Sequence, residues 1–417
     1  IQGDMVHPYL KRRQGKERLE KISPAVDAVL ARTFGVPIFQ EQVMQLAVVA
    51  ANFTPGEADQ LRRAMAAWKR KGGLEPFEQK LLAGMAANGL PESFARRIIA
   101  QIQGFGEYGF PESHAASFAL LVYASAWLKR HHPAAFLCAL LNSQPMGFYS
   151  PSMLVQDARR HGVGVLPPDV TTSDWDCRLE PTGAVRLGLR EINGFTKAAA
   201  DRIVAVDRKN RPFFDVADLA ARASLQRRDL DLLAAADALL SLAGHRRQAA
   251  WAASAALVQG DLFAGVMAPE APANLPIPSE AENLIGDYQH LKLTLGRHPL
   301  SLLREHLTAR RFVSAAELKI AEHRTPIRAA GIVVGRQRPG TATGIVFVTL
   351  EDESGLVNIV VHPQLIEKQR RELLGATLLG VYGQLQKDGE VVHLVAKRLV
   401  DLSSWLGRLE THSRDFH

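Results

Sequence analysis

The sequence predicts a multidomain protein in which a long all-α region is followed by an all-β barrel. Residues 24–165 repeat apolar side chains at the three- and four-residue spacing of amphipathic helices. In residues 326–400, apolar and polar side chains instead alternate with the period of two that is typical of strands. Residues 258–283 are rich in Ala, Pro and Gly, which predicts a linker. With 417 residues, of which 47% are hydrophobic, the chain is long enough for two to four separately packed cores.

In the first region, helix boundaries are marked by capping residues and prolines. Thr54 is a good N-cap and Pro55 suits the first helical position, whereas Pro133 ends the longest helix. The predicted helices span 41–53, 57–70, 76–89, 91–104 and 113–132. A short strand-like piece, 184–192, then leads into a second helical unit that ends near 257.

The C-terminal third predicts a specific barrel. A small mixed segment over 283–307 precedes it. Strands are expected over 326–335, 344–352, 357–363, 376–386 and 390–400, with a helical insert over 362–375. Five strands with one helix between the third and the fourth are the order of the OB-fold.

Charge and cysteine content narrow the class of protein. Fifty Lys and Arg against 43 Asp and Glu give a net charge of +7, which fits a nucleic-acid partner. Cys138 and Cys177 lack CxxC spacing, so neither a disulfide framework nor a zinc site is predicted, and a reducing cytoplasm is the expected location. No apolar run approaches 18 residues, so membrane association is not expected.

One long motif gives the most specific information. Residues 105–151, FGEYGFPESHAASFALLVYASAWLKRHHPAAFLCALLNSQPMGFYSP, resemble the end of the fingers domain of C-family bacterial DNA polymerases, the family of the DNA polymerase III alpha subunit. FPESHA and NSQPMGFYSP are similar to the error-prone, damage-inducible branch of that family. Further matching motifs, which extend the resemblance over nearly the whole chain, lie at 35–47, 61–65, 293–300 and 336–355 and in the terminal SRDFH.

This resemblance implies an organisation in five parts. They are a fingers domain (1–168), a helix-hairpin-helix region (169–257), a linker with a small mixed segment (258–325), an OB-fold (326–402) and a tail (403–417). It implies nucleotidyl transfer to a primer in damage-induced translesion synthesis, DNA repair and DNA replication, with primer–template, single-stranded DNA and a dNTP as ligands. Translesion accessory proteins are further expected partners.

In this family, two Mg²⁺ ions are held by aspartates of a palm domain that precedes the fingers. No closely spaced Asp pair on an apolar strand occurs in the sequence, which starts at Ile1. We therefore expect a C-terminal piece without the palm that is inactive by itself. The alternatives are a fragment of the replicative alpha subunit, although the sequence ends soon after the barrel, and a non-catalytic DNA-binding module.

The resemblance also assigns nucleotide-binding residues in the fingers. LRRAM places Arg62 and Arg63 beside the incoming nucleotide, where several cations are needed to bind a triphosphate. Lys69, Arg70 and Lys71 follow at the end of the same helix. For His114 two roles remain open, a contact to a phosphate or a cap of the following helix.

The DNA-binding candidates lie in two motifs. Residues 189–204 resemble a helix-hairpin-helix, with Gly194 at the first glycine position, Thr196 at the second and Lys197 beside it. A second, degenerate copy is predicted over 225–247, where Asp237 occupies a glycine position. In the OB-fold the candidates are Arg336, Arg338, Phe347, Tyr382 and Lys387, of which Phe347 is expected in the core.

The linker carries a short peptide motif. Gln259, Leu262 and Phe263 match the pattern with which bacterial polymerases bind their sliding clamp. Leu262 and Phe263 would fill an apolar pocket of the clamp, and Gln259 would hydrogen-bond its rim. The chain is therefore expected to have a sliding clamp as one of its partners.

Overall fold

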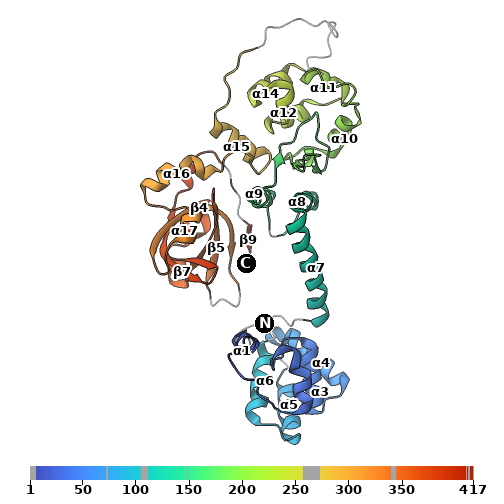
Figure 1. The fold of residues 1–417 in the computed structure, drawn as a ribbon, viewed down its shortest axis with the longest axis vertical. Coiled ribbons are helices and arrows are strands. Elements are labelled where there is room, and N and C mark those ends of the chain that lie inside the picture. The colour runs from blue at the N-terminus through green and yellow to red at the C-terminus, as the bar shows by residue number, and fades with distance from the viewer. Residues whose placement is uncertain are drawn as a thin grey trace. The chain divides into compact units, whose positions relative to one another are not determined.

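A computed structural model describes residues 6–71, 74–104, 111–147, 149–256, 273–339, 344–409, 411 and 414–416 (Figure 1). The chain forms two compact units, Ile1–Trp127 and Leu128–His417. The first is all helical, and the second combines helices with the barrel, which confirms the predicted fold class. The predicted limits of the five parts remain predictions.

The first unit is a helical bundle. It contains α1 (Val6–Arg13), α2 (Pro24–Leu30), η2 (Ala31–Thr33), α3 (Gln40–Ala51), α4 (Pro55–Lys71), α5 (Glu75–Ala87), α6 (Glu92–Gly104) and the start of α7 (Glu112–His131). Thr54 caps α4 as predicted, because its Oγ1 accepts a hydrogen bond from the Glu57 backbone N–H at 3.3 Å, and the Glu57 carboxylate accepts one from Thr54 N–H at 2.9 Å. Leu61 and Met65 of α4 are buried in the same core as Leu46 and Leu81.

A buried glutamine fixes the start of α3. Gln42 is 1% exposed, and its Oε1 accepts hydrogen bonds from the N–H groups of Ile38 and Phe39 at 3.0 and 3.2 Å. Its Nε2 donates to Val29 O and to Thr33 Oγ1. All its polar atoms are therefore satisfied, as a buried amide requires, and the chain that enters α3 is tied to α2 and η2.

The helical part of the second unit shares one core. It consists of α8 (Pro133–Asn142), α9 (Pro151–Arg160), β1 (Val165–Leu166), β2 (Arg178–Leu179), β3 (Val185–Arg186), η3 (Leu189–Glu191), α10 (Lys197–Ala205), α11 (Val216–Arg222), α12 (Arg227–Ala235), α13 (Leu240–Ala243) and α14 (Arg246–Ala255). Leu141 of α8 and Val155 of α9 lie in the core that also holds Ile203 and Leu233. Residues on both sides of the predicted boundary at 168 thus pack together.

The barrel has the predicted OB-fold topology. Helices α15 (Glu280–His290), α16 (Pro299–Ala309) and α17 (Ala315–Ile320) precede strands β4 (Pro326–Gln337), β5 (Val346–Asp352), β6 (Gly355–Val361), β7 (Leu378–Asp388) and β8 (Val391–Asp401). Helices α18 (Pro363–Lys368) and α19 (Arg370–Gly375) form the insert, and η4 (Ser403–Leu406) follows the last strand.

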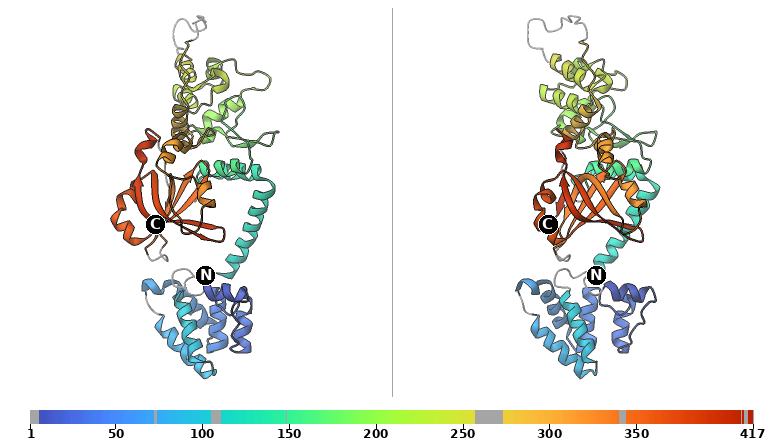
Figure 2. Two further views of the ribbon diagram at one scale, coloured as in Figure 1. Left: turned by 60° about the vertical axis from the view of Figure 1, so that its left-hand side comes forward. Right: turned by 90° about the vertical axis from the view of Figure 1, so that its left-hand side faces the viewer.

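The strands close on themselves into a barrel (Figure 2). Their order is β5-β6-β8-β7-β4, with β4 also paired to β5. The parallel β6–β8 pair closes the barrel. A strand that the sequence analysis did not predict, β9 (Arg414–Phe416), pairs with β4.

A buried acidic corner joins the barrel to the helices. Asp352, 2% exposed, accepts hydrogen bonds from Arg304 of α16 at 3.2 Å and from the Ala315 N–H that starts α17 at 2.7 Å. The neighbouring Glu353 accepts two hydrogen bonds from Arg304, and the Glu351 carboxylate lies 3.6 Å from Arg160 of α9. Three consecutive carboxylates, two at the end of β5 and one in the turn that follows it, therefore contact α9, α16 and α17.

We expect the second unit to lose stability on acidification through His298, which packs at this corner. Burial lowers the pKa of His298 to about 4, although Glu353 and Asp352 act in the opposite direction. An unfolded histidine titrates near pH ~6.5, so only the unfolded chain takes up this proton between pH 6.5 and 4. The free energy of unfolding should fall across this window by at most about 3 kcal/mol from this group.

His298→Asn isolates that contribution. Asparagine can keep the cap of α16, in which the His298 Nδ1 accepts from the Leu300 N–H at 3.2 Å. Denaturant unfolding of both proteins from pH 7 to pH 4 should show the variant losing less stability than the parent. Parallel curves would contradict the assignment.

Candidate nucleic-acid interface

The arginines of α4 share one carboxylate, which the sequence analysis missed. Arg62 donates to Asp59 through Nε at 3.0 Å, and the Arg63 guanidinium lies 2.8 Å from the other Asp59 oxygen. The Arg62 hydrogen bond is the main reason that the pKa of Asp59 is lowered. Both cations are partly exposed, and such exposed pairs are weak. A phosphate group could therefore compete with Asp59 for them.

The remaining nucleotide-binding candidates divide into two groups. Lys69, Arg70 and Lys71 form the end of α4, but their side chains lie outside the described residues. His114 lies inside the first turn of α7, and its ring packs on Phe118 with the ring centroids 4.4 Å apart. The helix begins at Glu112, whose N–H donates to the Glu41 carboxylate at 2.9 Å. His114 is therefore the third residue of the helix and not its first, and its two predicted roles, a phosphate contact or a helix cap, stay predictions.

The first hairpin has the backbone that a phosphate contact needs. Gly194 adopts a left-handed φ of 78°, and the chain then enters α10 through Thr196. The Thr196 Oγ1 accepts from the Ala199 N–H at 3.2 Å, which makes Thr196 the N-cap at the second glycine position. The first-turn N–H groups of a helix have no intrahelical acceptor, and Lys197 at the start of α10 is exposed. Gly194, Thr196 and Lys197 are thus brought together at one exposed turn.

The second hairpin has a left-handed backbone at the glycine position, although the residue there is Asp237. Asp237 has a φ of 60°, a conformation that Asp tolerates better than most residues. Burial raises the pKa of its carboxyl group, partly opposed by Arg246. Arg246 donates to Asp287 of α15 at 2.7 Å, so this hairpin is fastened to the helix that leads to the barrel. A buried carboxyl group here does not favour phosphate contact.

Arg336 is a structural residue, which corrects its assignment to DNA binding. Its side chain is 7% exposed and donates to Leu373 O at 2.7 Å and to Ala376 O at 2.5 Å, at the end of α19. These bonds satisfy carbonyl groups that a helix C-terminus leaves without partners. Arg338, two residues later, is exposed beyond the end of β4 and is available to a ligand.

A cavity with a volume of about 300 Å³ opens on the barrel between α17, β6 and the β7–β8 turn. The lining residues are Leu318, Lys319, Leu356, Val357, Asn358, Lys387, Gly389, Glu390 and Val392. The ammonium of Lys387, a predicted site residue, donates to Lys319 O at 2.7 Å. The cavity combines apolar walls with two ammonium groups and the exposed side chain of Asn358.

Phe347 lies on the outer face of the barrel and not in its core, contrary to expectation. Its neighbours Val346 and Val348 point into the core, so Phe347 points the other way along β5. It pairs with Val360 on β6 and with Gln337 on β4. Tyr382, the other aromatic candidate, packs against Phe312 and lies beneath Arg328 and Arg398. Phe347 is therefore the better stacking candidate of the two.

Three further expectations concern ligands and partners. Gln259, Leu262 and Phe263 lie outside the described residues. In the described part of the chain, no three His, Cys, Asp or Glu side chains are grouped closely enough to hold a metal ion. The ligands of the predicted Mg²⁺ are expected outside this chain. Within the same ranges, no helix is both long enough and apolar enough to cross a membrane.

The comparisons with known proteins match three separate segments. Residues 1–89 match the bacterial DNA polymerase III alpha subunit finger domain, 162–249 a helix-hairpin-helix motif and 327–402 an OB-fold nucleic acid binding domain. The chain is 83% identical over 417 residues to an error-prone DNA polymerase of Dechloromonas aromatica and 63% identical over 430 aligned positions to one of an Azoarcus species. All of the chain is covered in both alignments, but only 41% and 40% of these relatives.

A solved asparaginyl-tRNA synthetase from Pyrococcus horikoshii covers 22% of this chain and 23% of its own length, with 20% identity and a TM-score of 0.20. The sequence matches confirm the predicted resemblance to the DNA polymerase III alpha subunit family and to its error-prone branch.

Arg336 and Arg338 provide a matched pair for testing these assignments. Arg336→Met should leave the carbonyls of Leu373 and Ala376 without their donor and destabilise the barrel by about 1–3 kcal/mol. Arg338→Ala should leave the melting temperature unchanged but lower the salt slope of single-stranded DNA binding by about 1, the value for one phosphate contact. Thermal unfolding and fluorescence anisotropy over a salt series would measure both. Equal melting temperatures for Arg336→Met and the parent would refute the structural role.

Proposed function

We propose that this chain, a relative throughout its length of error-prone DNA polymerases, binds DNA and the incoming nucleotide for template-directed synthesis past damaged bases. The single observation that carries the proposal is the order of its modules. A finger-domain match, a helix-hairpin-helix and an OB-fold follow one another, within a chain that is 83% identical to an error-prone DNA polymerase. Because the chain spans 41% of that relative, the activity of the whole protein is part of the proposal.

In the proposed reaction, a primer 3′-OH attacks a deoxynucleoside triphosphate and releases pyrophosphate. Arg62 and Arg63, with Lys69, Arg70, Lys71 and His114, are proposed to bind the triphosphate. The exchange of Asp59 for a phosphate at Arg62 and Arg63 would retain their charge neutralisation, which supports this role. Mg²⁺ is the proposed cofactor of the whole protein, and its ligands would lie outside this chain.

The DNA contacts are proposed to come from the second unit. The exposed turn of Gly194, Thr196 and Lys197 would bind a phosphate of the duplex through backbone N–H groups. On the barrel, Arg338 and Lys387 would contact a single strand that crosses Phe347 and enters the cavity beside Asn358. On this path Phe347 would be the stacking surface, and Arg338 and Lys387 would be the cations at its two ends.

The proposal also covers the setting in which the protein acts, its location and its contact with a sliding clamp. We propose a damage-induced setting and translesion accessory proteins as partners, which the similarity to error-prone DNA polymerases supports. A bacterial cytoplasm is the proposed location because the DNA lies there. The Gln259, Leu262 and Phe263 peptide is proposed to bind the sliding clamp. Burial of its two large apolar side chains would contribute about 1.5–3 kcal/mol each.

A chimera tests the proposed activity. The part of the Dechloromonas aromatica relative that aligns with this chain would be replaced by these 417 residues. If the chain performs the same role, the chimera should extend a primer opposite an abasic site at a rate within about tenfold of the parent, and Arg62→Ala with Arg63→Ala should raise KM for the nucleotide. A stable chimera without template-dependent extension would refute the proposal.

The clamp contact is tested separately. A 255–268 peptide should bind the clamp of the same organism with micromolar affinity, because most of the apolar gain is offset by ordering of the peptide. Leu262→Ala with Phe263→Ala should abolish this binding, measured by anisotropy, and should not affect DNA binding by the whole chain. Equal clamp binding by both peptides would show that the match is accidental.

A further inference from the structure

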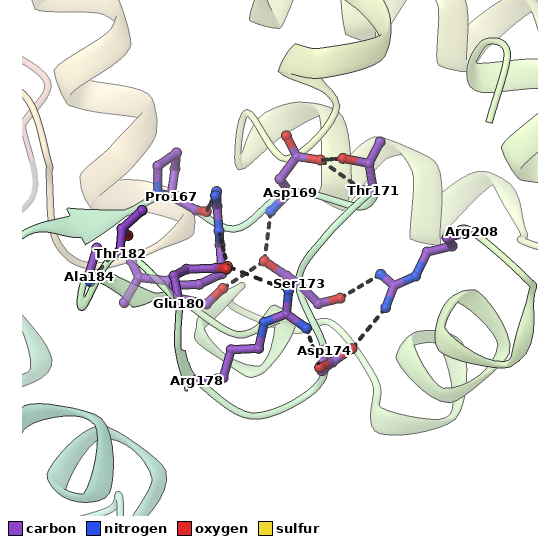
Figure 3. A network of polar contacts seen from close by, with 12 residues as sticks. Pro167, Asp169, Thr171, Ser173, Asp174, Arg178, Glu180, Thr182, Ala184 and Arg208 are labelled. Atoms are coloured by element: carbon purple, nitrogen blue, oxygen red, sulfur yellow. Dashed lines mark hydrogen bonds and ion pairs between the residues drawn. The ribbon is translucent and has the colours of Figure 1, made fainter. Parts of the chain in front are cut away.

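The loop over residues 207–214, between α10 and α11, is held in place from its N-terminal end by Arg208. The Arg208 guanidinium is mostly buried and donates to Ser173 O at 2.7 Å and to an Asp174 oxygen at 2.8 Å (Figure 3). It also donates to Val170 O at 3.0 Å. The chain around Ser173 is itself fixed, because Ser173 Oγ donates to Leu187 O at 2.8 Å. The loop is therefore anchored to a rigid part of the helical core.

A second arginine holds the loop from its C-terminal side. The Arg222 guanidinium of α11 donates to the carbonyl groups of Asp207, Arg211 and Pro212 at 2.8–3.3 Å. It also donates to the Asp218 carboxylate at 3.0 Å and lies over the Phe213 ring, 4.8 Å from its centroid. Because these contacts are to backbone carbonyls, the shape of the loop is set independently of its outward side chains.

Two cations and one aromatic ring are among the side chains that the loop exposes to solvent, together with Asp207, Asn210 and Pro212. Phe213 is 6% exposed, whereas the next residue, Phe214, is 83% exposed. Lys209 and Arg211 are exposed, and neither side chain forms a hydrogen bond or an ion pair with another described residue. The loop thus presents a ring beside two cations, with its backbone ordered in advance.

The nearby carboxylates of Asp207 and Asp218 already accept hydrogen bonds from residues of the loop and of α11. The Asp207 carboxylate accepts hydrogen bonds from the N–H and the side-chain amide of Asn210, and these bonds lower its pKa. The Asp218 carboxylate accepts from the Phe214 N–H at 3.1 Å and from Arg222. Each negative charge therefore has donors of its own. The charge of Arg211 contributes to the lowered pKa of Asp218, but the side chains of Lys209 and Arg211 have no hydrogen bond or ion pair with a described residue that a ligand would have to break.

We propose that the 207–214 loop is a further nucleic-acid contact, in which Phe214 stacks on an unpaired base while Lys209 and Arg211 bind neighbouring phosphates. A polyanion with flat apolar groups matches both kinds of side chain. A single strand is favoured over a duplex because the bases of a duplex are already stacked on one another. The inference rests on the proposed function only in taking DNA as the ligand, and it adds a site outside the hairpin turn and the barrel.

The test uses the whole 417-residue chain with a 20-nucleotide single strand of mixed sequence and the duplex of the same sequence. Stacking on one base contributes about 1–3 kcal/mol, so Phe214→Leu should weaken single-strand binding by roughly 5- to 150-fold and leave its salt slope unchanged. Phe214→Tyr should bind like the parent, because it keeps the ring. Lys209→Gln with Arg211→Gln should lower the salt slope by about 2. Trp251→Leu, which removes an exposed aromatic ring from α14, is the control and should change nothing.

The possible failures are distinguishable. If the parent chain binds neither DNA, the proposed function fails. If the parent binds the single strand and Phe214→Leu binds it equally well, the loop proposal alone is overturned, and Phe214 is left to contact a protein. Equal loss of single-strand and duplex affinity would also overturn the stacking role. Melting temperatures should be the same for all variants, because each altered side chain is exposed, and the double cation variant gives a second test that does not depend on Phe214.

Discussion

The second unit depends on one buried carboxylate, that of Asp352. Its Oδ1 accepts hydrogen bonds from Ser354 N–H, Ser354 Oγ and Gly355 N–H, which shape the turn from β5 into β6. Its Oδ2 binds the Ala315 N–H and Arg304, which belong to α17 and α16. Loss of one partner from a buried pair costs about 3–5 kcal/mol, so the turn, the two helices and the barrel should form or fail together.

Buried structural arginines and exposed arginines lie close together in the sequence at two places in this unit. Arg336 and Arg338 are two residues apart, yet one is buried against the carbonyls of α19 and the other is exposed. Arg208 and Arg211 show the same division in the 207–214 loop. In each case an arginine that binds main-chain carbonyls orders a segment on which a neighbouring cation is exposed. A net charge of +7 does not distinguish the two kinds.

Local patterns predicted most of the fold. Helical periodicity, Thr54 as a cap and the five alternating segments of the barrel depend on residues within a few positions of one another, and the structure confirms them. The burial of Arg336 depends on carbonyls 37 and 40 residues away, and the cap of α7 comes from Glu41, 71 residues from Glu112. Pairing of Asp59 with Arg62 and Arg63 was accessible from helical spacing. Phe347 was missed because a continuous apolar run hides which residues face the core.

If the second unit binds DNA as proposed, the hairpin turn of residues 193–199 and the barrel are engaged together. Hydrogen–deuterium exchange of the whole chain, titrated with a primer–template that has a single-stranded overhang, tests this most directly. We expect residues 193–199 and residues 356–360 with 387–392 to become protected at the same DNA concentration. Protection of one region without the other, or protection with well-separated midpoints, would contradict it.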